Sequence, residues 1–293
     1  MPKKLLVIGS GAIGVEFAYL YQSYGSKVTL IESMSQILPK EDEEISKALS
    51  RSFRKLGIEM HTSTSVSELV CLENKGRITL DSQGTKKEFW VDRVLVATGI
   101  TPNIENIGIE NAQAHITDGF VSVDENLLVN GKNVYAIGDI NGRIPLAHVA
   151  QAEGVFAAEH IAGLAPQPLD YNAMPRAVYC NPQIASIGLT EKEATDKGYS
   201  VKVGKFPFLA NGKSLTADER EGFVKIVGEA NTGELLGAHL IGHEVTELLG
   251  ELSLTRALDG TTQELGGLVK AHPSASEVIK EAALATYESA LHI

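Results

Sequence analysis

The sequence predicts an α/β protein that opens with a parallel-sheet unit and closes with an α+β block. Three observations predict this fold class. The aliphatic run Leu5–Ile8 fits a strand buried on both faces of a parallel sheet. A helical spacing of apolar residues over 14–24 follows it, and strand character returns over 27–32. From about Tyr171, strand and helix patterns alternate again, and 293 residues allow about two domains.

The turn after the first strand reads Gly9-Ser10-Gly11-Ala12-Ile13-Gly14, which has the G-x-G-x-x-G spacing. Gly9 permits a tight bend, Gly11 lets backbone approach a pyrophosphate, and Gly14 lets the helix pack closely against the strand. The helix N-terminus adds unpaired N–H groups that favour phosphate. The pattern predicts a Rossmann-like dinucleotide-binding domain. The alternative is a glycine-rich turn without a ligand.

Glu32 closes the second strand and predicts which dinucleotide binds. A carboxylate accepts hydrogen bonds from both hydroxyls of the adenosine ribose, but it repels a 2′-phosphate. Residues 33–36 contain no Arg or Lys that could compensate. The sequence therefore predicts NAD in preference to NADP, with a solvated strand end as the alternative interpretation of Glu32.

The remainder of the first hundred residues predicts an antiparallel insertion. A helix over 41–56 is followed by short strand patterns over 58–62, 66–72, 77–80 and 89–91. These patterns are interpreted as a third parallel strand followed by a β-meander. A buried strand over 93–97 then ends at Thr98-Gly99. A meander inserted before the last parallel strand is unusual in a plain dehydrogenase domain.

The second half of the chain contains two further recognisable blocks. Val134–Asp139 is predicted as a strand that ends in Gly-Asp, and an apolar helix follows over 146–161. After Tyr171, strands are predicted over 177–187, 201–207, 222–227 and 235–241. Thr190 and Glu193 have the spacing of a capping box that starts a short helix.

Near the end stands Lys270-Ala271-His272-Pro273-Ser274-Ala275-Ser276-Glu277, a His-Pro pair with a Glu five residues after the His. Together with the glycine turn, the meander and the Gly138-Asp139 strand end, this stretch resembles the pyridine-nucleotide disulfide oxidoreductases. Among them, it is most similar to the dihydrolipoamide dehydrogenases. The resemblance covers essentially the whole chain.

The resemblance implies an NAD-binding domain over 1–100, the returning part of an FAD-binding domain over 101–170 and a dimerisation domain over 171–293. Asp139 would bind the flavin ribityl chain, and Ala147 would lie beside the flavin. The predicted cofactor-binding residues are Gly9, Gly11, Gly14, Glu16, Glu32, Gly99, Asp139 and Ala147. The partners implied are a second copy of the chain and the lipoyl domain of a 2-oxo acid dehydrogenase complex.

The resemblance also makes His272 the acid–base residue for the substrate thiols and Glu277 the residue that orients it. The residue types suit this chemistry, because an imidazole accepts a thiol proton near neutral pH and a carboxylate fixes its tautomer. Ser274 and Glu277 also have capping-box spacing, so Glu277 has a structural alternative that can coexist with the first role.

The chain departs from the family pattern in four respects. No flavin-binding glycine turn precedes the NAD unit, no C-x-x-x-x-C pair occurs, Ile100 stands where many members have Arg, and Lys270 stands where many have His. We therefore expect the C-terminal portion of a dihydrolipoamide dehydrogenase, without the N-terminal FAD and redox-disulfide segment and inactive in isolation.

Several alternatives remain at this stage. Enzymatic alternatives are a soluble pyridine nucleotide transhydrogenase or another flavoprotein disulfide reductase. Glu32 argues against the NADP-dependent glutathione and trypanothione reductases, and the chain end lacks the paired cysteines of mercuric reductases. An alternative of a different class is a non-catalytic NAD-binding dimerisation module.

Composition excludes other classes. A net charge of −11 and no clustered basic stripe argue against nucleic acid. The two cysteines, Cys71 and Cys180, suggest neither a disulfide framework nor a metal site. No run of about 18 apolar residues predicts a membrane span. We expect an intracellular protein of the bacterial cytoplasm or the mitochondrial matrix.

Overall fold

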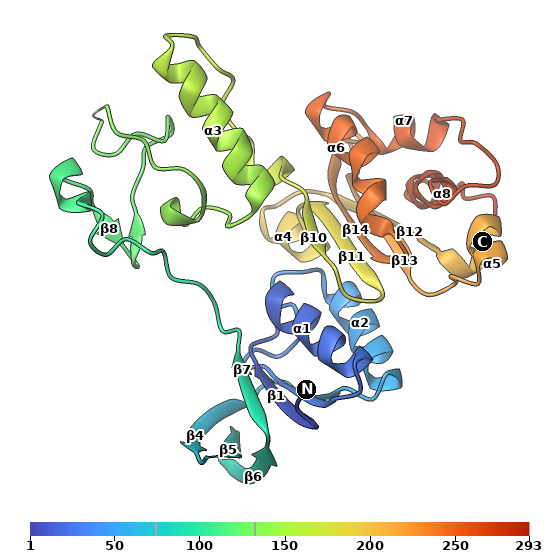
Figure 1. Cartoon of the computed structure of the whole chain (residues 1–293). Helices are drawn as coiled ribbons and strands as arrows, with labels where there is room; N and C mark the ends of the chain where they lie inside the picture. Colours follow the sequence, from blue (N-terminus) through green and yellow to red (C-terminus); the bar gives the residue numbers. More distant parts are fainter. Residues whose placement is uncertain (74, 132, 293) are drawn as a thin grey trace. The chain divides into compact units, whose positions relative to one another are not determined.

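The computed structural model describes residues 1–73, 75–131 and 133–292. Two compact units make up the chain, residues 1–99 with 175–293, and residues 100–174 (Figure 1). The opening and closing blocks of the sequence thus share one unit. The predicted α/β class, with a Rossmann-type parallel sheet and a dimerisation-type α+β block, is confirmed.

The start of the first unit is a parallel sheet in the order β3-β2-β1-β7. Its strands are β1 (Lys4–Ile8), β2 (Lys27–Ile31), β3 (Glu59–His61) and β7 (Arg93–Val96). The helices are α1 (Ala12–Ser23) and α2 (Glu43–Lys55). The predicted meander forms a separate antiparallel sheet of β4 (Ser65–Cys71), β5 (Gly76–Ser82) and β6 (Thr85–Val91).

The end of the chain adds an antiparallel sheet in the order β10-β11-β14-β13-β12. Its strands are β10 (Arg176–Val178), β11 (Gln183–Gly188), β12 (Val201–Pro207), β13 (Phe223–Glu229) and β14 (Leu235–Gly242). The helices are α4 (Glu191–Asp196), α5 (Gly212–Ala217), α6 (Leu249–Ala257), α7 (Thr262–Gly267) and α8 (Glu277–Ala285), with 3-10 turns at Phe208–Ala210 and Val245–Leu248. The capping box predicted at Thr190 and Glu193 is present at the start of α4.

One hydrophobic core joins the parallel sheet and the five-stranded antiparallel sheet of this unit. Leu30 and Phe53 of the parallel-sheet block belong to the same buried cluster as Ile184 and Ile241 of the antiparallel sheet. Burial of apolar surface is the main stabilising contribution in such a core. A second cluster packs α8 and α6 against the other side chains of the antiparallel sheet.

The second unit contains one long helix, α3 (Ala147–Ile161), and short elements. These are 3-10 turns at Ile109–Ala112, Gly138–Asn141 and Tyr171–Ala173, and the two-residue strands β8 (Ile116–Thr117) and β9 (Phe120–Val121).

Two segments that were each predicted as one strand do not form one regular strand in the structure. The stretch 134–139 is no regular strand, because its pairing is limited to one bridge between Tyr135 and Leu128. The chain then turns at Gly138, whose φ of +72° cannot continue a strand. The run 177–187 is a hairpin of β10 and β11, since Pro182 offers no N–H to a ladder.

Candidate functional site

The glycine turn connects β1 to α1 and is shaped by close backbone approaches. Gly9 has a φ of +94°, and a Cβ there would lie 2.3 Å from the carbonyl oxygen of Ala97. A Cβ on Gly14 would lie 1.9 Å from the carbonyl oxygen of Gly9. Gly11, in contrast, faces open space and caps α1 without a side-chain hydrogen bond. The first turn of α1 therefore presents free N–H groups, as a phosphate-binding helix N-terminus does.

Glu32 lies directly after β2 and is buried beside this turn. Its Oε2 accepts hydrogen bonds from the backbone N–H of Ser10 at 2.9 Å and the Ser10 hydroxyl at 2.7 Å. Its Oε1 accepts from the N–H of Met34 at 2.8 Å and the Ser33 hydroxyl at 3.1 Å. Burial opposes ionisation, but these donors outweigh it and hold the pKa of Glu32 below its ordinary value. The group is an anionic acceptor fixed against the glycine turn.

Two further predicted cofactor-binding residues are Glu16 and Gly99. Glu16, on α1, accepts a hydrogen bond at 2.8 Å from the backbone N–H of Tyr179, in the hairpin between β10 and β11. Gly99 follows β7 with a φ of +143°, a conformation that favours glycine. Sequence reasoning missed Ser10 and Tyr179, and only the x positions of the glycine motif could have pointed to Ser10.

The arrangement fits an NAD-type nucleotide. Uncapped N–H groups and the open space at Gly11 suit a pyrophosphate, and the carboxylate of Glu32 suits a ribose diol. The residues at 33–36 add no positive side chain for a 2′-phosphate.

Asp139 and Ala147 belong to the second unit, where Asp139 is exposed on the 3-10 turn Gly138–Asn141 and Ala147 starts α3. This turn is held by Glu153, a buried carboxylate on α3 that the sequence analysis missed. Glu153 accepts hydrogen bonds from Gly138 N–H at 2.6 Å and Asn141 at 2.9 Å. A Glu at the middle of the apolar stretch 146–161 was the available signal.

His272 and Glu277 are brought together at the start of α8. The imidazole Nδ1 lies 2.9 Å from Glu277 Oε1, and the His272 side chain is 76% exposed. The backbone N–H of Ser274 donates to Glu277 Oε2 at 2.8 Å and, with His272, holds the pKa of Glu277 below its ordinary value. Only this half of the predicted capping box forms, because α8 begins at Glu277 with Ser276 as its cap. Glu277 thus has both a structural and an orienting contact.

A cavity of about 200 Å³ adjoins this pair. Its charged and titratable lining comprises Lys270, His272, Glu277, Lys280, Glu281 and His292. With Nδ1 bonded to a carboxylate, the Nε2 of His272 is the atom left to exchange a proton with a substrate.

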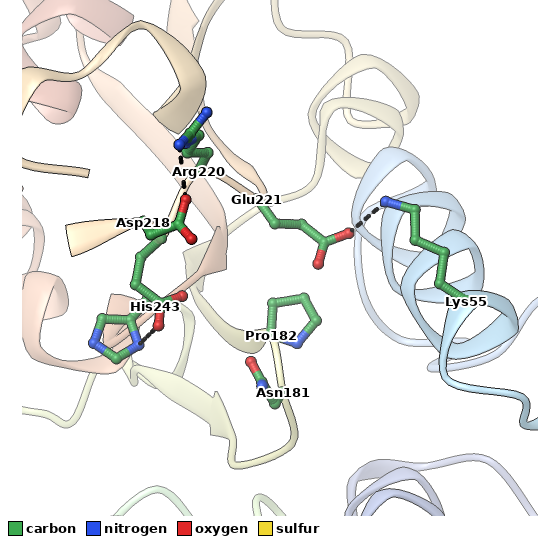
Figure 2. A pocket seen from close by; sticks show the side chains of 8 residues that line it. Lys55, Asn181, Pro182, Asp218, Arg220, Glu221 and His243 are labelled. Atoms are coloured by element: carbon green, nitrogen blue, oxygen red, sulfur yellow. Dashed lines mark hydrogen bonds and ion pairs between the residues drawn. The ribbon is translucent and has the colours of Figure 1, made fainter. Parts of the chain in front are cut away.

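A second, polar cavity of about 420 Å³ lies elsewhere in the same unit (Figure 2). Its side chains pair with one another: Lys55 with Glu221 at 3.2 Å and Arg220 with Asp218 at 2.8 Å. His243 lies 3.7 Å from Glu219. Lys55 and Arg220, which line this cavity, are thus each paired with a carboxylate.

Both cysteines are free thiols, and they lie in different environments. Burial, helped by the charge of Glu16, raises the pKa of Cys180 to about 12, and Cys71 is an exposed free thiol on β4.

Across 1–73, 75–131 and 133–292, no three His, Cys, Asp or Glu side chains form a possible metal site. Within the same ranges, no helix has the length and apolar character needed to span a bilayer.

Comparison with known proteins places this fold and site in a family. Residues 1–154 match the pyridine nucleotide-disulphide oxidoreductases, and residues 174–283 match the dimerisation domain of that family. The chain therefore belongs to the pyridine nucleotide-disulphide oxidoreductase family.

Several similar proteins are dihydrolipoyl dehydrogenases. Dihydrolipoyl dehydrogenase of Mycobacterium tuberculosis is 44% identical over 96% of this chain and 61% of its own length. That of Bacillus subtilis is 42% identical over 100% of this chain and 62% of its own length. The chain thus spans about three fifths of the length of these relatives.

Solved structures agree with this assignment. LpdA from Mycobacterium tuberculosis superposes with a TM-score of 0.88 at 26% identity, over 96% of this chain and 61% of LpdA. The HOCl-induced flavoprotein disulfide reductase RclA from Escherichia coli superposes with a TM-score of 0.88 at 25% identity, over 96% of this chain and 64% of RclA.

Proposed function

We propose that this chain forms the NAD-binding and dimer-forming portion of a dihydrolipoyl dehydrogenase, which oxidises protein-bound dihydrolipoamide and reduces NAD⁺. The observation that carries the proposal is the His272–Glu277 pair at 2.9 Å, in a chain that also has an open glycine turn beside Glu32. The names of the relatives that are 42–44% identical support the same substrate.

His272 would accept the substrate proton. A thiol must become a thiolate before it attacks a disulfide, and the Nε2 of His272 can take its proton. Glu277 stays ionised at neutral pH because its pKa is lowered, so it keeps the Nδ1–H bond and stabilises the imidazolium.

The cofactors would use two parts of the chain. Free N–H groups of α1 and the carboxylate of Glu32 would hold NAD, and Asp139, on the turn fixed by Glu153, would bind the flavin ribityl chain in the longer enzyme. Bound flavin supplies the electron transfer between a disulfide and the nicotinamide.

A homodimer would form through the region after Tyr171, which matches a dimerisation domain. Exposed apolar side chains on α6 and after α7 support this, since Leu254, Leu258 and Val269 are 60%, 71% and 94% exposed. The segment that carries Val269 lies beside α6, because Lys270 pairs with Glu251. The lipoyl domain of a 2-oxo acid dehydrogenase complex is the proposed partner.

The proposal is tested by His272→Ala in a longer enzyme that joins this chain to a flavin- and disulfide-bearing segment. Turnover of dihydrolipoamide should fall roughly 10²- to 10⁴-fold, as is usual when a positioned general base is removed. The matched control is His243→Ala, which removes a half-exposed imidazole from the polar cavity in Figure 2. A loss below about tenfold, in an assay limited by the thiol half-reaction, would mean that the proton goes elsewhere.

A second candidate is a flavoprotein disulfide reductase with another substrate. The equal structural similarity to RclA supports it. The same longer enzyme discriminates the two, because rapid NADH formation from dihydrolipoamide favours the first candidate. Slow turnover of dihydrolipoamide, with rapid NADH-dependent reduction of a different disulfide, favours the second.

A further inference from the structure

Helix α8 carries the carboxylates of two imidazole–carboxylate pairs. Glu277 and Glu281 are four residues apart and therefore lie on one face of the helix, one turn from each other. Glu277 bonds Nδ1 of His272, and Glu281 bonds Nδ1 of His292, both at 2.9 Å. Both pairs line the same cavity of about 200 Å³.

The second pair is built into the fold. Glu281 is buried, with a side chain only 7% exposed. Its Oε2 accepts hydrogen bonds from the backbone N–H groups of Leu291 and His292, at 2.8 and 3.4 Å. His292 is thus held through both its backbone N–H and its ring Nδ1, while 68% of its side chain remains exposed. Such an arrangement fixes the ring orientation and leaves Nε2 toward solvent.

Two lysines and the two carboxylates of α8 also line the cavity. Lys270 is paired with Glu251 of α6, Lys280 is an ammonium, and the two carboxylates on α8 are bonded to their histidines. Ordinary ammonium and carboxyl groups titrate far above or below neutral pH. Histidine is the side-chain type that ordinarily changes charge near neutral pH, and two histidines line this cavity.

We propose that His292 and Glu281 form a second proton-binding pair that controls when His272 releases its proton. His292 is a positioning residue in this scheme, because it acts through His272 and not on the substrate. An imidazolium at His292 repels a positive charge on His272, so His272 is kept in its base form to lower pH. The lowered pKa of Glu277, to which the charges of both histidines contribute, is consistent with this proximity.

The role in catalysis rests on the proposed function, but the coupling itself is measurable in the 293-residue chain. Histidine ring protons are followed by NMR from pH 5 to pH 9. His292→Gln should raise the titration midpoint of His272 by about 0.3 to 0.6 units, the size expected when a nearby unit charge is removed from a partly hydrated site. Glu281→Gln, which retains an oxygen acceptor for the chain end, should lower the midpoint of His292.

The control is His243→Gln, which removes an exposed imidazole from the polar cavity. It should leave the His272 midpoint unchanged. An unchanged His272 midpoint in His292→Gln, or an equal shift in the His243→Gln control, would overturn the inference. The measurement needs neither flavin nor thiol substrate, so an inactive longer enzyme with the expected shift would contradict the proposed function and support the coupling.

Discussion

At the scale of single residues, the carboxylate of Glu32 is already fully used within the protein. Two backbone N–H groups and the hydroxyls of Ser10 and Ser33 donate to it, which fills the roughly four acceptor positions of a carboxylate. A ribose that donates two hydroxyls must displace some of these donors. The serine hydroxyls can rotate away, whereas the backbone groups cannot move without opening the turn.

This competition yields a paired prediction. Glu32→Ala should weaken NAD binding by roughly 1 to 3 kcal/mol, because charge-assisted hydrogen bonds are lost. Ser33→Ala should tighten NAD binding about two- to tenfold, because a competing donor of roughly 0.5 to 1.5 kcal/mol is removed. Isothermal titration calorimetry with NAD and NADP measures both, and wild type should prefer NAD. Equal or tighter NADP binding, or a Ser33→Ala variant that binds NAD less tightly, would contradict this account.

The residues of the candidate site differ in how far sequence alone predicts them. Gly9, Gly14 and Glu32 are tied to their neighbours by local spacing, so a motif suffices. Glu153 acts on a turn that lies 12 to 15 residues earlier in the chain, and the Glu16–Tyr179 bond joins residues 163 positions apart. These contacts lie outside any recurrent motif and depend on how the elements pack, so no local pattern encodes them.

At the scale of elements, local patterns predict the strands best where no residue inside the run ends the pairing. β12 matches its predicted span of 201–207, and β1 and β2 differ from theirs by one residue. The failures at 134–139 and 177–187 arise at Gly138 and Pro182, where one residue ends the pairing inside an apolar run. Apolar periodicity indicates burial there but does not indicate a hydrogen-bonded neighbour.

One ionic cluster fastens α2 to the antiparallel sheet. Lys225, on β13, is 2% exposed, and its ammonium lies 3.0 Å from Asp42, 3.0 Å from Glu44 and 2.7 Å from Glu191. Burial opposes its charge, but the three carboxylates outweigh burial and raise the pKa of Lys225. Asp42 also caps α2 by accepting a hydrogen bond from Glu44 N–H.

Lys225→Met should lower the free energy of unfolding by about 3 to 5 kcal/mol, because it leaves Asp42 buried without its cation. Urea denaturation followed by circular dichroism measures the change. The double variant Lys225→Met/Asp42→Asn keeps an oxygen to cap α2 and removes the unpaired charge, so it should recover part of the loss. A Lys225→Met protein as stable as wild type would show that the cluster contributes nothing.

The same cluster determines how the stability of the protein depends on pH. Because the pKa of Lys225 is raised, its contribution to the free energy of unfolding is complete at neutral pH and is lost only at high pH. Lys205 and Lys225 overcome the effect of burial and lower the pKa of Glu44, so its contribution is present above its ordinary value of 4.5 and is lost as pH falls. Wild-type stability should therefore decline below about pH 4.5, and less steeply in Lys225→Met.

At the scale of the whole molecule, the apolar surface beside α6 predicts association. Leu258→Asp combined with Val269→Asp should convert the proposed dimer to monomer in sedimentation velocity, because charges would be buried in an apolar contact. Val155→Asp is the matched control, since Val155 is 60% exposed on α3 in the other unit. Wild type that sediments only as a monomer at micromolar concentration would count against the homodimer.

The electron path predicts what the 293-residue chain does when produced alone. Two electrons must pass from a dithiol to the nicotinamide through groups that change oxidation state, and Glu32, Asp139 and His272 do not. The chain contains two cysteines, of which Cys180 is buried with a pKa near 12 and Cys71 lies on the separate meander sheet. Its single G-x-G-x-x-G turn connects β1 to α1, where it forms the proposed NAD site.

We therefore expect the purified chain to be colourless, to bind NAD and to form no NADH from dihydrolipoamide. Absorbance between 350 and 500 nm, measured after added FAD is removed by gel filtration, tests flavin retention. In the proposed function Asp139 would contact the ribityl chain, but the 293 residues contain no second G-x-G-x-x-G turn for the flavin pyrophosphate. Absorbance at 340 nm follows NADH. Stoichiometric flavin, or NADH formation above that of the Glu32→Ala control, would mean that the chain carries its own redox relay, and the proposed division of the electron path would be wrong.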